Sequence, residues 1–228
     1  MRRTLSSDLR MLAFASVVLL LAGGSGAQQS VGADILAPGV ISTGNVLRGS
    51  FTADGRTLFF FRRTSMVGEQ YEIVESRLAR GRWTTPVRVD LGGNFSDIYP
   101  SISRDGQHLV FASYRHGGEA GGSSDTRLFI ADRTRTGWSS PRELAGSPAG
   151  AYNAGPEFAP DGTIWFTSIQ GPSRRFLRMS LDGTVEENTA LATWIDWRKD
   201  RYYWGGSPSP DGRTLILTIS PIDSITGR

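Results

Sequence analysis

Residues 101–111 read SISRDGQHLVF, and three other segments repeat this arrangement of an Asp-Gly pair followed by an apolar run. They are FTADGRTLFFF at 51–61, EFAPDGTIWF at 157–166 and SPSPDGRTLIL at 207–217. The intervals between successive aspartates are 51, 56 and 50 residues. Recurrence at such a period is typical of repeat architectures, so the chain is predicted to be a series of similar units. The repeated pairs are Asp54-Gly55, Asp105-Gly106, Asp161-Gly162 and Asp211-Gly212.

The second unit shows what one repeat contains. It holds four short segments rich in Val, Ile, Phe and Tyr, which is typical of strands: YPSIS, QHLVFASY, TRLFIADRT and WSSPREL. In the Asp-Gly pair the glycine tolerates a positive φ, and the aspartate can accept a hydrogen bond from the backbone that follows. Each unit is therefore predicted to be a four-stranded antiparallel meander with a tight first corner.

The second strand of each unit is a continuous apolar run, whereas a half-exposed strand would alternate. Continuous runs indicate burial on both faces, as occurs when each sheet packs between the sheets before and after it. The expected fold class is all-β, a β-propeller of four-stranded antiparallel blades. The runs are Leu58–Phe61, Leu109–Phe111, Ile164–Phe166 and Leu215–Leu217, and the predicted repeats are 45–92, 93–146, 147–198 and 199–228.

Two tryptophans mark the third corner of the first two units. Trp83 lies in GRWTTP and Trp138 in GWSSP, and they are 55 residues apart, close to the Asp-Gly interval. A tryptophan can offer a platform for stacking a sugar, or it can fill the wedge between neighbouring sheets. The wedge is favoured, because a position repeated from unit to unit serves the repeat.

These motifs carry a resemblance to a known family. ADGRTLFFF, RDGQHLVFAS, PDGTIWFTS and PDGRTLILT, with GWSSPREL after the second, resemble the TolB-like family of WD-repeat-like β-propellers over about residues 34–228. The resemblance implies an exported bacterial propeller, usually of about six blades. PDGTIW also partly matches the aspartate box of sialidases, but Asp161 and Gly162 are adjacent, so the spacing of that motif is not met.

The fourth unit reaches Arg228 shortly after its second strand, which leaves about three and a half to four blades where propellers have about four to eight. A fragment of a larger, six-bladed propeller is therefore expected. ADILAPGVIS at 33–42 is interpreted as a lone strand whose place in a complete ring is beside the last blade.

Residues 1–27 have the features of a signal peptide. Arg2, Arg3 and Arg10 precede or flank the apolar stretch 11–22, and Ser25-Gly26-Ala27 offers a cleavage site. The apolar stretch is shorter than the roughly 20 residues that a membrane span needs, so no stable span is expected after cleavage. The mature domain, residues 28–228, is expected to be periplasmic or secreted, and without cysteine it contains no disulfide.

Charge and motifs restrict the function. The formal net charge of +3 falls to +1 without the leader, and no basic run interleaved with aromatics suggests nucleic acid. Neither a metal-ligand set around His108 and His116, nor a nucleophile elbow, nor a phosphate loop is recognisable, so no cofactor or metal is expected. The leading hypothesis is a non-catalytic binding or scaffold module with a protein or cell-envelope partner. The alternative is a propeller hydrolase of carbohydrate or peptide.

A binding site is expected where the longer loops and the starts of the inner strands gather, at the mouth of the central channel. The segment 194–204, WIDWRKDRYYW, combines aromatic and basic residues, which favours either packing of an inter-blade link or docking of a sugar or peptide. The predicted binding residues are Asn94, Asp97, Tyr99, Tyr152, Asn153, Glu157, Trp197, Tyr203 and Trp204. No catalytic residue is predicted.

Overall fold

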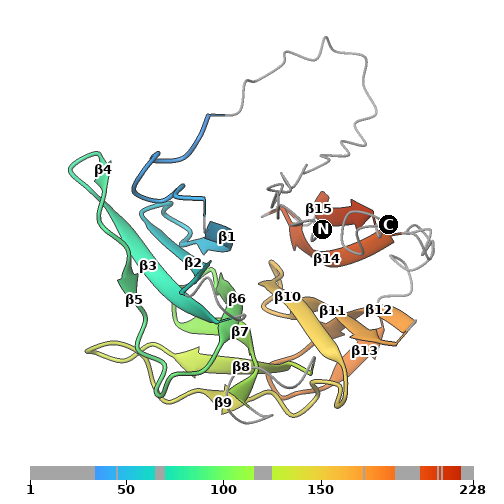
Figure 1. Cartoon of the computed structure of the whole chain (residues 1–228). Coiled ribbons are helices and arrows are strands. Elements are labelled where there is room, and N and C mark those ends of the chain that lie inside the picture. Colours follow the sequence, from blue (N-terminus) through green and yellow to red (C-terminus); the bar gives the residue numbers. More distant parts are fainter. Residues whose placement is uncertain are drawn as a thin grey trace, which may run out of the picture.

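The structure is a computed structural model of the chain, and it describes residues 34–44, 46–64, 70–115, 125–171, 173–187, 201–209, 211 and 213–221. Within these ranges the regular elements are strands, in four antiparallel sheets (Figure 1). The first sheet contains β1 (Val46–Phe51), β2 (Thr57–Arg63), β3 (Tyr71–Ala79), β4 (Arg82–Trp83) and β5 (Val87–Arg88). The second contains β6 (Asp97–Ile102), β7 (His108–Ser113), β8 (Arg127–Asp132) and β9 (Arg142–Glu143).

The third sheet contains β10 (Tyr152–Phe158), β11 (Ile164–Gln170), β12 (Ser173–Met179) and β13 (Val185–Glu187), and the fourth contains β14 (Arg201–Pro208) and β15 (Leu215–Pro221). In the second and third sheets the strand order follows the chain, as expected for a meander. In the first sheet β3 pairs with both β4 and β5. The all-β class and the four-stranded antiparallel blades are therefore confirmed.

The Asp-Gly corners adopt the predicted conformation. φ is +67° at Gly55, +72° at Gly106 and +82° at Gly162. Each corner aspartate accepts a hydrogen bond from the backbone amide two residues later, at 3.0 Å for Asp105 and Gln107. The Ser103 hydroxyl also donates to Asp105 at 2.6 Å. Ser103 and the Gln107 amide together lower the pKa of Asp105.

The four sheets are arranged around a common centre, with the first strand of each sheet innermost (Figure 1). β6 packs against β1, β2 and β3; β10 packs against β6 and β7; and β14 packs against β10 and β11. One cluster of buried side chains runs through the first three sheets and includes Phe59, Phe111 and Phe166. The burial of β7, where Leu109 to Ser113 are all buried, agrees with a sheet covered on both faces.

Trp83 and Trp138 both pack against aromatic side chains of the sheets. Trp138 of the second unit meets Phe59 of the first edge to face, with ring centroids 5.8 Å apart, and the guanidinium of Arg133 lies 4.8 Å from the centroid of the Trp138 ring. Trp83 packs on a smaller buried cluster and meets Phe51 at 5.9 Å. The contact of Trp138 with the neighbouring unit agrees with the wedge interpretation, whereas the contacts of Trp83 lie within its own unit.

Two expectations for the ends of the array are wrong. Residues 37–42 form a turn closed by a bridge between Pro38 and Ser42, and Ile41 packs on Leu58, Phe60 and Val74 of the first sheet. The segment is not a strand, because burying Ile41 on an apolar sheet face outweighs extended pairing. The run Leu215–Leu217 is not buried on both faces either, since the side chain of Ile216 is 47% exposed. Among the described residues, no sheet covers the other face of β14 and β15.

Candidate functional site

A bulge recurs in the inner strand of every sheet. The pairing register shifts between Val46 and Gly49 in β1, and β6, β10 and β14 shift at the corresponding places. Such a bulge bends a strand and re-aims the side chain at the bend. The residue six positions before the corner aspartate lies in each bulge: Arg48, Tyr99, Gly155 and Gly205.

Two large side chains and two glycines therefore occupy equivalent positions near the centre. A Cβ atom on Gly205 would lie 2.4 Å from Nη1 of Arg48 and 2.8 Å from the carbonyl oxygen of Gly155. Gly205 also has a φ of +127°, which side chains rarely adopt. Glycine is thus required where the arginine of the first unit passes between the third and fourth.

Tyr99 is the tyrosine among these positions, and its φ is +55°. A bulky residue in the left-handed region is an outlier that costs about 1–3 kcal/mol, and such outliers gather at functional sites. The hydroxyl oxygens of Tyr99 and Tyr152 lie 3.2 Å apart, and the rings of Tyr99 and Phe61 meet at 4.9 Å. The strained backbone thus aims the Tyr99 ring at the starts of the inner strands.

Four half-buried tyrosines gather at this end of the sheets, which we call the loop end: Tyr71, Tyr99, Tyr114 and Tyr152. This group is named the tyrosine cluster. Phe61 links Tyr71, at a centroid distance of 5.7 Å, to Tyr99. Burial raises the pKa of Tyr152 well above its ordinary value, and the neighbouring Tyr99 and Tyr114 raise it further. The Tyr152 phenol therefore stays a neutral hydrogen-bonding group at physiological pH.

At the loop end of the second unit, Asp97 forms an ion pair with Arg115. Arg115 donates to Asp97 at 2.7 Å, and the Ser113 hydroxyl donates to it at 2.5 Å. The guanidinium of Arg115 also lies over the rings of Phe95 and Phe129, at 4.9 and 5.1 Å. Burial raises the pKa of Asp97, and Arg115 opposes that shift. Asp97 is 6% exposed, so it holds Arg115 in place and does not face solvent.

Glu157 lies where the third sheet meets the fourth, which we call the third junction, and it binds Arg48 of the first unit. Nη2 of Arg48 donates to Oε2 of Glu157 at 3.0 Å and to the Ser207 hydroxyl at 3.3 Å. The side chains of Arg48 and Glu157 are 18% and 17% exposed. Burial raises the pKa of Glu157, while Arg48 and Ser101 lower it. One arginine therefore connects the first, third and fourth units near the centre.

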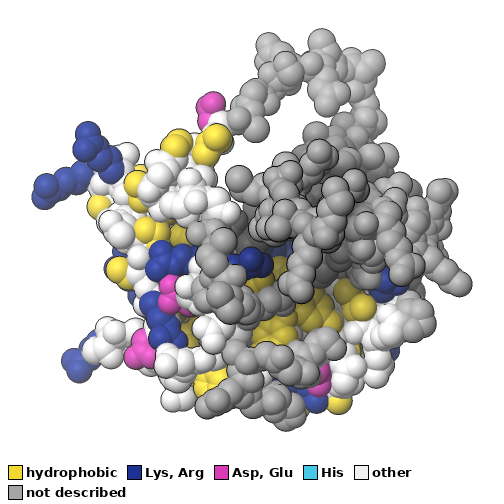
Figure 2. Space-filling view, in the orientation of Figure 1, with side chains coloured by type: hydrophobic (Ala, Val, Ile, Leu, Met, Phe, Trp, Pro, Cys, Tyr) yellow, Lys and Arg dark blue, Asp and Glu magenta, His cyan; other side chains and the backbone are white. Residues whose placement is uncertain are grey.

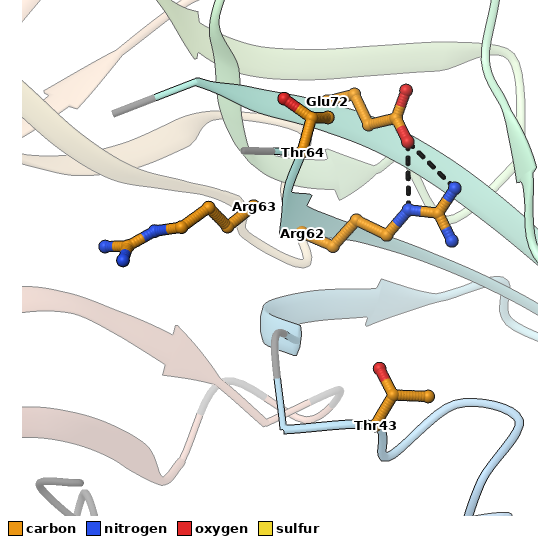
Figure 3. A pocket seen from close by; sticks show the side chains of 5 residues that line it. All are labelled: Thr43, Arg62, Arg63, Thr64 and Glu72. Carbon is orange, nitrogen blue, oxygen red and sulfur yellow. Dashed lines mark hydrogen bonds and ion pairs between the residues drawn. The ribbon is translucent and has the colours of Figure 1, made fainter. Parts of the chain in front are cut away.

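A hollow of about 420 Å³ opens at the loop end of the first unit, lined by Thr43, Arg62, Arg63, Thr64 and Glu72 (Figure 3). Arg62 is held by Glu72, with Nε and Nη2 at 2.9 and 2.8 Å from the same carboxylate oxygen. Figure 3 shows Arg63 pointing away from that pair. Arg63 is exposed, and its guanidinium lies 5.8 Å from the Tyr71 ring. The hollow thus adjoins the tyrosine cluster.

Charged and apolar side chains lie close together on this face. Figure 2 shows Lys and Arg side chains next to Asp and Glu side chains, with a patch of hydrophobic side chains beside them near the middle of the view. A guanidinium beside aromatic rings can bind a carboxylate and stack on a flat group at the same place.

The structure places the residues predicted for the site in different surroundings. Tyr99 and Tyr152 are brought together, and Asp97 lies in an ion pair at the same end, whereas Glu157 forms its ion pair farther along β10, toward the Asp-Gly corner. Asn94 is exposed and accepts a hydrogen bond from Arg88 at 3.0 Å. The side chains of Tyr203 and Trp204, and the whole of Trp197 and Gly212, lie outside the described residues.

Asn153 requires a correction. It is fully buried, and its amide group donates to the carbonyl oxygens of Thr126, Pro148 and Ala151. It shapes the link into β10 and cannot contact a ligand at the mouth. Sequence reasoning missed Arg48, Arg63 and Tyr114. For Arg48 a signal existed, since aligning the four corners places it opposite Tyr99, Gly155 and Gly205.

No group of three or more His, Asp or Glu residues suited to a metal ion occurs in the described part of the chain. His108 pairs across the strands with Asp132, with Nδ1 and Oδ1 2.7 Å apart, at the end opposite the tyrosine cluster. A search of the described residues likewise finds no helix long and apolar enough to cross a membrane.

No protein-family model matches the sequence, and neither does any curated protein. Solved structures similar in shape include a putative TolB from Agrobacterium tumefaciens, with 19% identity over 74% of this chain and 68% of that one and a TM-score of 0.40. A Mycobacterium tuberculosis puromycin-hydrolyzing peptidase shares 17% identity over 62% of this chain, with a TM-score of 0.45. An α-L-arabinofuranosidase from Lactobacillus brevis shares 11% over 72% of this chain and 61% of that one, with a TM-score of 0.44.

The chain spans 21% of the peptidase and 22% of a second puromycin hydrolase. The similar structures thus include a TolB-like propeller as well as hydrolases. Similarity at this level assigns neither an activity nor a partner to this chain.

Proposed function

We propose that this protein is an exported, non-catalytic binding module whose loop end takes a protein segment that carries carboxylates beside aromatic or apolar side chains. The observation that supports this best is the tyrosine cluster, held by a strained Tyr99 and adjoining the hollow at Arg63. Tyrosine and arginine are the residue types enriched at the energetic centres of protein interfaces. Tyrosine supplies rigid contact area with a polar tip, and arginine supplies a fork that matches a carboxylate.

The charges at the loop end support an anionic partner group. Arg62 is neutralised by Glu72, and the exposed Arg63, which donates to the Tyr71 hydroxyl at 3.4 Å, brings a second guanidinium to the rim of the same hollow. The hydroxyls of Thr43 and Thr64 line the hollow as well. A carboxylate placed there can accept hydrogen bonds from a guanidinium and a hydroxyl, and a neighbouring aromatic side chain can pack on Tyr71.

The alternative, a propeller hydrolase, draws less support from the same geometry. Glycosidases need two carboxyl groups that flank the reacting bond, one of them free to transfer a proton. The two largely buried acids among the predicted residues, Asp97 and Glu157, each face an arginine of their own, Arg115 and Arg48, and lie toward opposite ends of their inner strands. Ion pairs of this kind hold charged groups in place and favour a structural role for both acids.

The binding proposal is tested with a matched pair of arginine variants. Arg63 and Arg104 are both exposed and lie at opposite ends of the sheets, so Arg63→Ala and Arg104→Ala remove the same charge from different faces. The full chain of each variant is immobilised and exposed to a cell-envelope extract, and bound proteins are cross-linked and identified by mass spectrometry. A partner cross-linked to the loop end, kept by Arg104→Ala and reduced about tenfold by Arg63→Ala, is expected.

A partner retained equally by both variants, or cross-linked to the corner end, contradicts the proposed face. The same preparations are assayed with chromogenic glycosides and peptides. Turnover that disappears in Glu157→Gln would contradict the non-catalytic role and favour the hydrolase.

The extracytoplasmic location is part of the proposal and rests on the leader sequence at 1–27. Fractionation of expressing cells, followed by N-terminal sequencing of the mature protein, is expected to give a start near residue 28. A protein that keeps Met1 and stays in the cytoplasm would overturn this assignment.

A further inference from the structure

We propose that a second hollow, between the Asp-Gly corners of the first and second units, binds a small carboxylate that also carries hydroxyl groups, of the sugar-acid class. The hollow has a volume of about 280 Å³, and we call it the corner hollow. The first unit contributes Thr57, Glu75 and Arg77 to its lining, and the second contributes Gln107 and Arg133. It shares no residue with the hollow at the loop end, so this inference does not depend on the proposed function.

The first unit departs from the repeat at the corner hollow. Glu75 and Arg77 of β3 occupy the pairing positions that Leu177 and Met179 occupy in β12 of the third unit. Leu177 and Met179 are buried in the core cluster. In the first unit the side chain of Glu75 is only 15% exposed, and Nη2 of Arg77 donates to it at 2.8 Å. Positions that another unit fills with apolar side chains therefore carry an ion pair beside an open space.

Arg133 presents a positioned guanidinium to the same space. Its guanidinium lies 4.8 Å from the centroid of the Trp138 ring, and its backbone amide donates to the carbonyl oxygen of Gln107 at 2.7 Å. Within the part of the chain that the structure describes, the guanidinium forms neither a hydrogen bond nor an ion pair. A guanidinium that stacks on an aromatic ring keeps its fork of N–H donors for a carboxylate. Arg133 therefore supplies the donors for an acidic ligand.

The charges and polar groups of the corner hollow define the ligand class. Its lining has a formal charge of +1, because Arg77 and Arg133 are positive and Glu75 is negative. One carboxylate on the ligand neutralises this charge. Oε1 of Glu75 accepts from Arg77, and Oε2 accepts from no described residue, so it can accept from a ligand hydroxyl. The Thr57 hydroxyl and the Gln107 side-chain amide offer further hydrogen bonds.

The size of the corner hollow and its apolar part suit a single sugar ring. Phe59 and Ile102 also line it, and they are 1% and 6% exposed. The C–H groups of a ring can pack on these side chains while the polar groups fix its orientation. At roughly 30 Å³ for each water of the liquid, the volume corresponds to about nine waters, which is room for a ligand of about a dozen non-hydrogen atoms. A hexuronic acid has this size, one carboxylate and several hydroxyls.

Isothermal titration calorimetry of the full chain tests the proposal with three probes. Methyl β-D-glucuronide carries both the carboxylate and the hydroxyls, methyl β-D-glucoside lacks the carboxylate, and cyclohexanecarboxylate lacks the hydroxyls. The glucuronide is expected to bind with a Kd of about 1 mM or lower, which a ligand of this size reaches at ordinary ligand efficiency. Each of the other two probes is expected to bind at least about tenfold more weakly, because it loses hydrogen bonds to charged groups.

A matched pair of arginine variants locates the site. Arg133→Ala is expected to weaken glucuronide binding about tenfold. Arg135→Ala is the control, because Arg135 is exposed in the same turn and does not line the corner hollow, and it is expected to bind as the wild type. Arg63→Ala is also expected to leave glucuronide binding unchanged, which separates this result from the outcome for the loop end.

The proposal is overturned if the glucoside or cyclohexanecarboxylate binds the wild type as tightly as the glucuronide does, a comparison that needs no variant to fold. It is equally overturned if the glucuronide gives no binding at concentrations up to about 10 mM. Equal affinities of Arg133→Ala and Arg135→Ala for the glucuronide would overturn the assignment to the corner hollow.

Discussion

Two junctions, between the first and second sheets and between the second and third, differ in chemistry from the third junction, between the third and fourth sheets. Ser50 and Ser101 bind the next inner strand through its backbone amide, whereas Glu157 binds an arginine that lies 109 residues away in the sequence. The neutral bonds connect neighbours and depend only on the repeat. The ionic bond connects the first unit to the third, and the same arginine also donates to Ser207 of the fourth. It needs a carboxylate, an arginine and two glycines that the other junctions lack. The repeat thus builds identical interfaces, and its exceptions give the centre its particular chemistry.

Glu157→Ala is the change expected to lower stability most, because it removes the ionic bond of the third junction. It removes one partner of a largely buried ion pair and leaves Arg48 without its carboxylate, at a cost of about 3 kcal/mol in the free energy of unfolding. Glu75→Ala is the matched control. Glu75 is similarly buried, but its partner Arg77 is 56% exposed, so a loss below about 1 kcal/mol is expected. Urea denaturation measures both losses of stability, and equal losses would show that the Arg48–Glu157 pair contributes no more than the exposed pair.

Gly205→Ala tests the space that the side chain of Arg48 requires beside the fourth unit. The new Cβ atom would approach Arg48 and the backbone of Gly155 at less than van der Waals distance, and φ is positive, so a loss of about 2 kcal/mol is expected. Gly137→Ala serves as control, because a Cβ atom there meets nothing within 4 Å and φ is not in the positive range. If thermal melts give the two variants the same stability, Arg48 does not pass where we place it.

Ser101→Ala weakens a neutral junction. The amide of Phe158 loses its acceptor in a buried place, which is expected to lower stability by about 1–2 kcal/mol. Ser207→Ala, at the equivalent position of the fourth unit, is expected to cost less than about 0.5 kcal/mol because Arg48 keeps its bond to Glu157. The reverse order in denaturation experiments would show that the hydroxyl, and not the carboxylate, holds the third junction.

Asp105→Asn gives the smallest expected effect and separates two responses to acid. The pKa of Asp105 is lowered in the folded protein, first by Ser103 and then by the Gln107 amide, so its contribution is present above the unfolded value and is lost as pH falls through the folded value. Glu157 has a raised folded pKa, so its protonation in the folded state begins at higher pH and does not itself favour unfolding. The variant is expected to lose less stability than the wild type on acidification, by under about 0.5 kcal/mol. Parallel melting curves from neutral to acid pH would contradict this.

Prediction from sequence succeeded where the determining contacts are local. An Asp-Gly corner depends on a glycine at positive φ and on an aspartate that binds an amide two residues away, and both are properties of adjacent residues. The burial of β2, β7 and β11 was predicted from their continuous apolar runs, again because such a run is a property of adjacent residues. The run in β15 was misjudged, since its burial depends on whether another sheet lies against it. Asn153 was misjudged because polarity alone does not show whether an amide faces water or backbone carbonyls.

By itself, the sequence determined the repeat, the corners, the strands and the all-β class, because each follows from the conformational preferences and polarity of residues that are neighbours along the chain. Only the tertiary structure decided which side chains meet at the centre. The contact between Tyr99 and Tyr152 spans 53 residues, and the contact between Arg48 and Glu157 spans 109. Such pairs form only after the sheets have taken their angles around the centre, and those angles depend on packing between sheets that no single repeat contains.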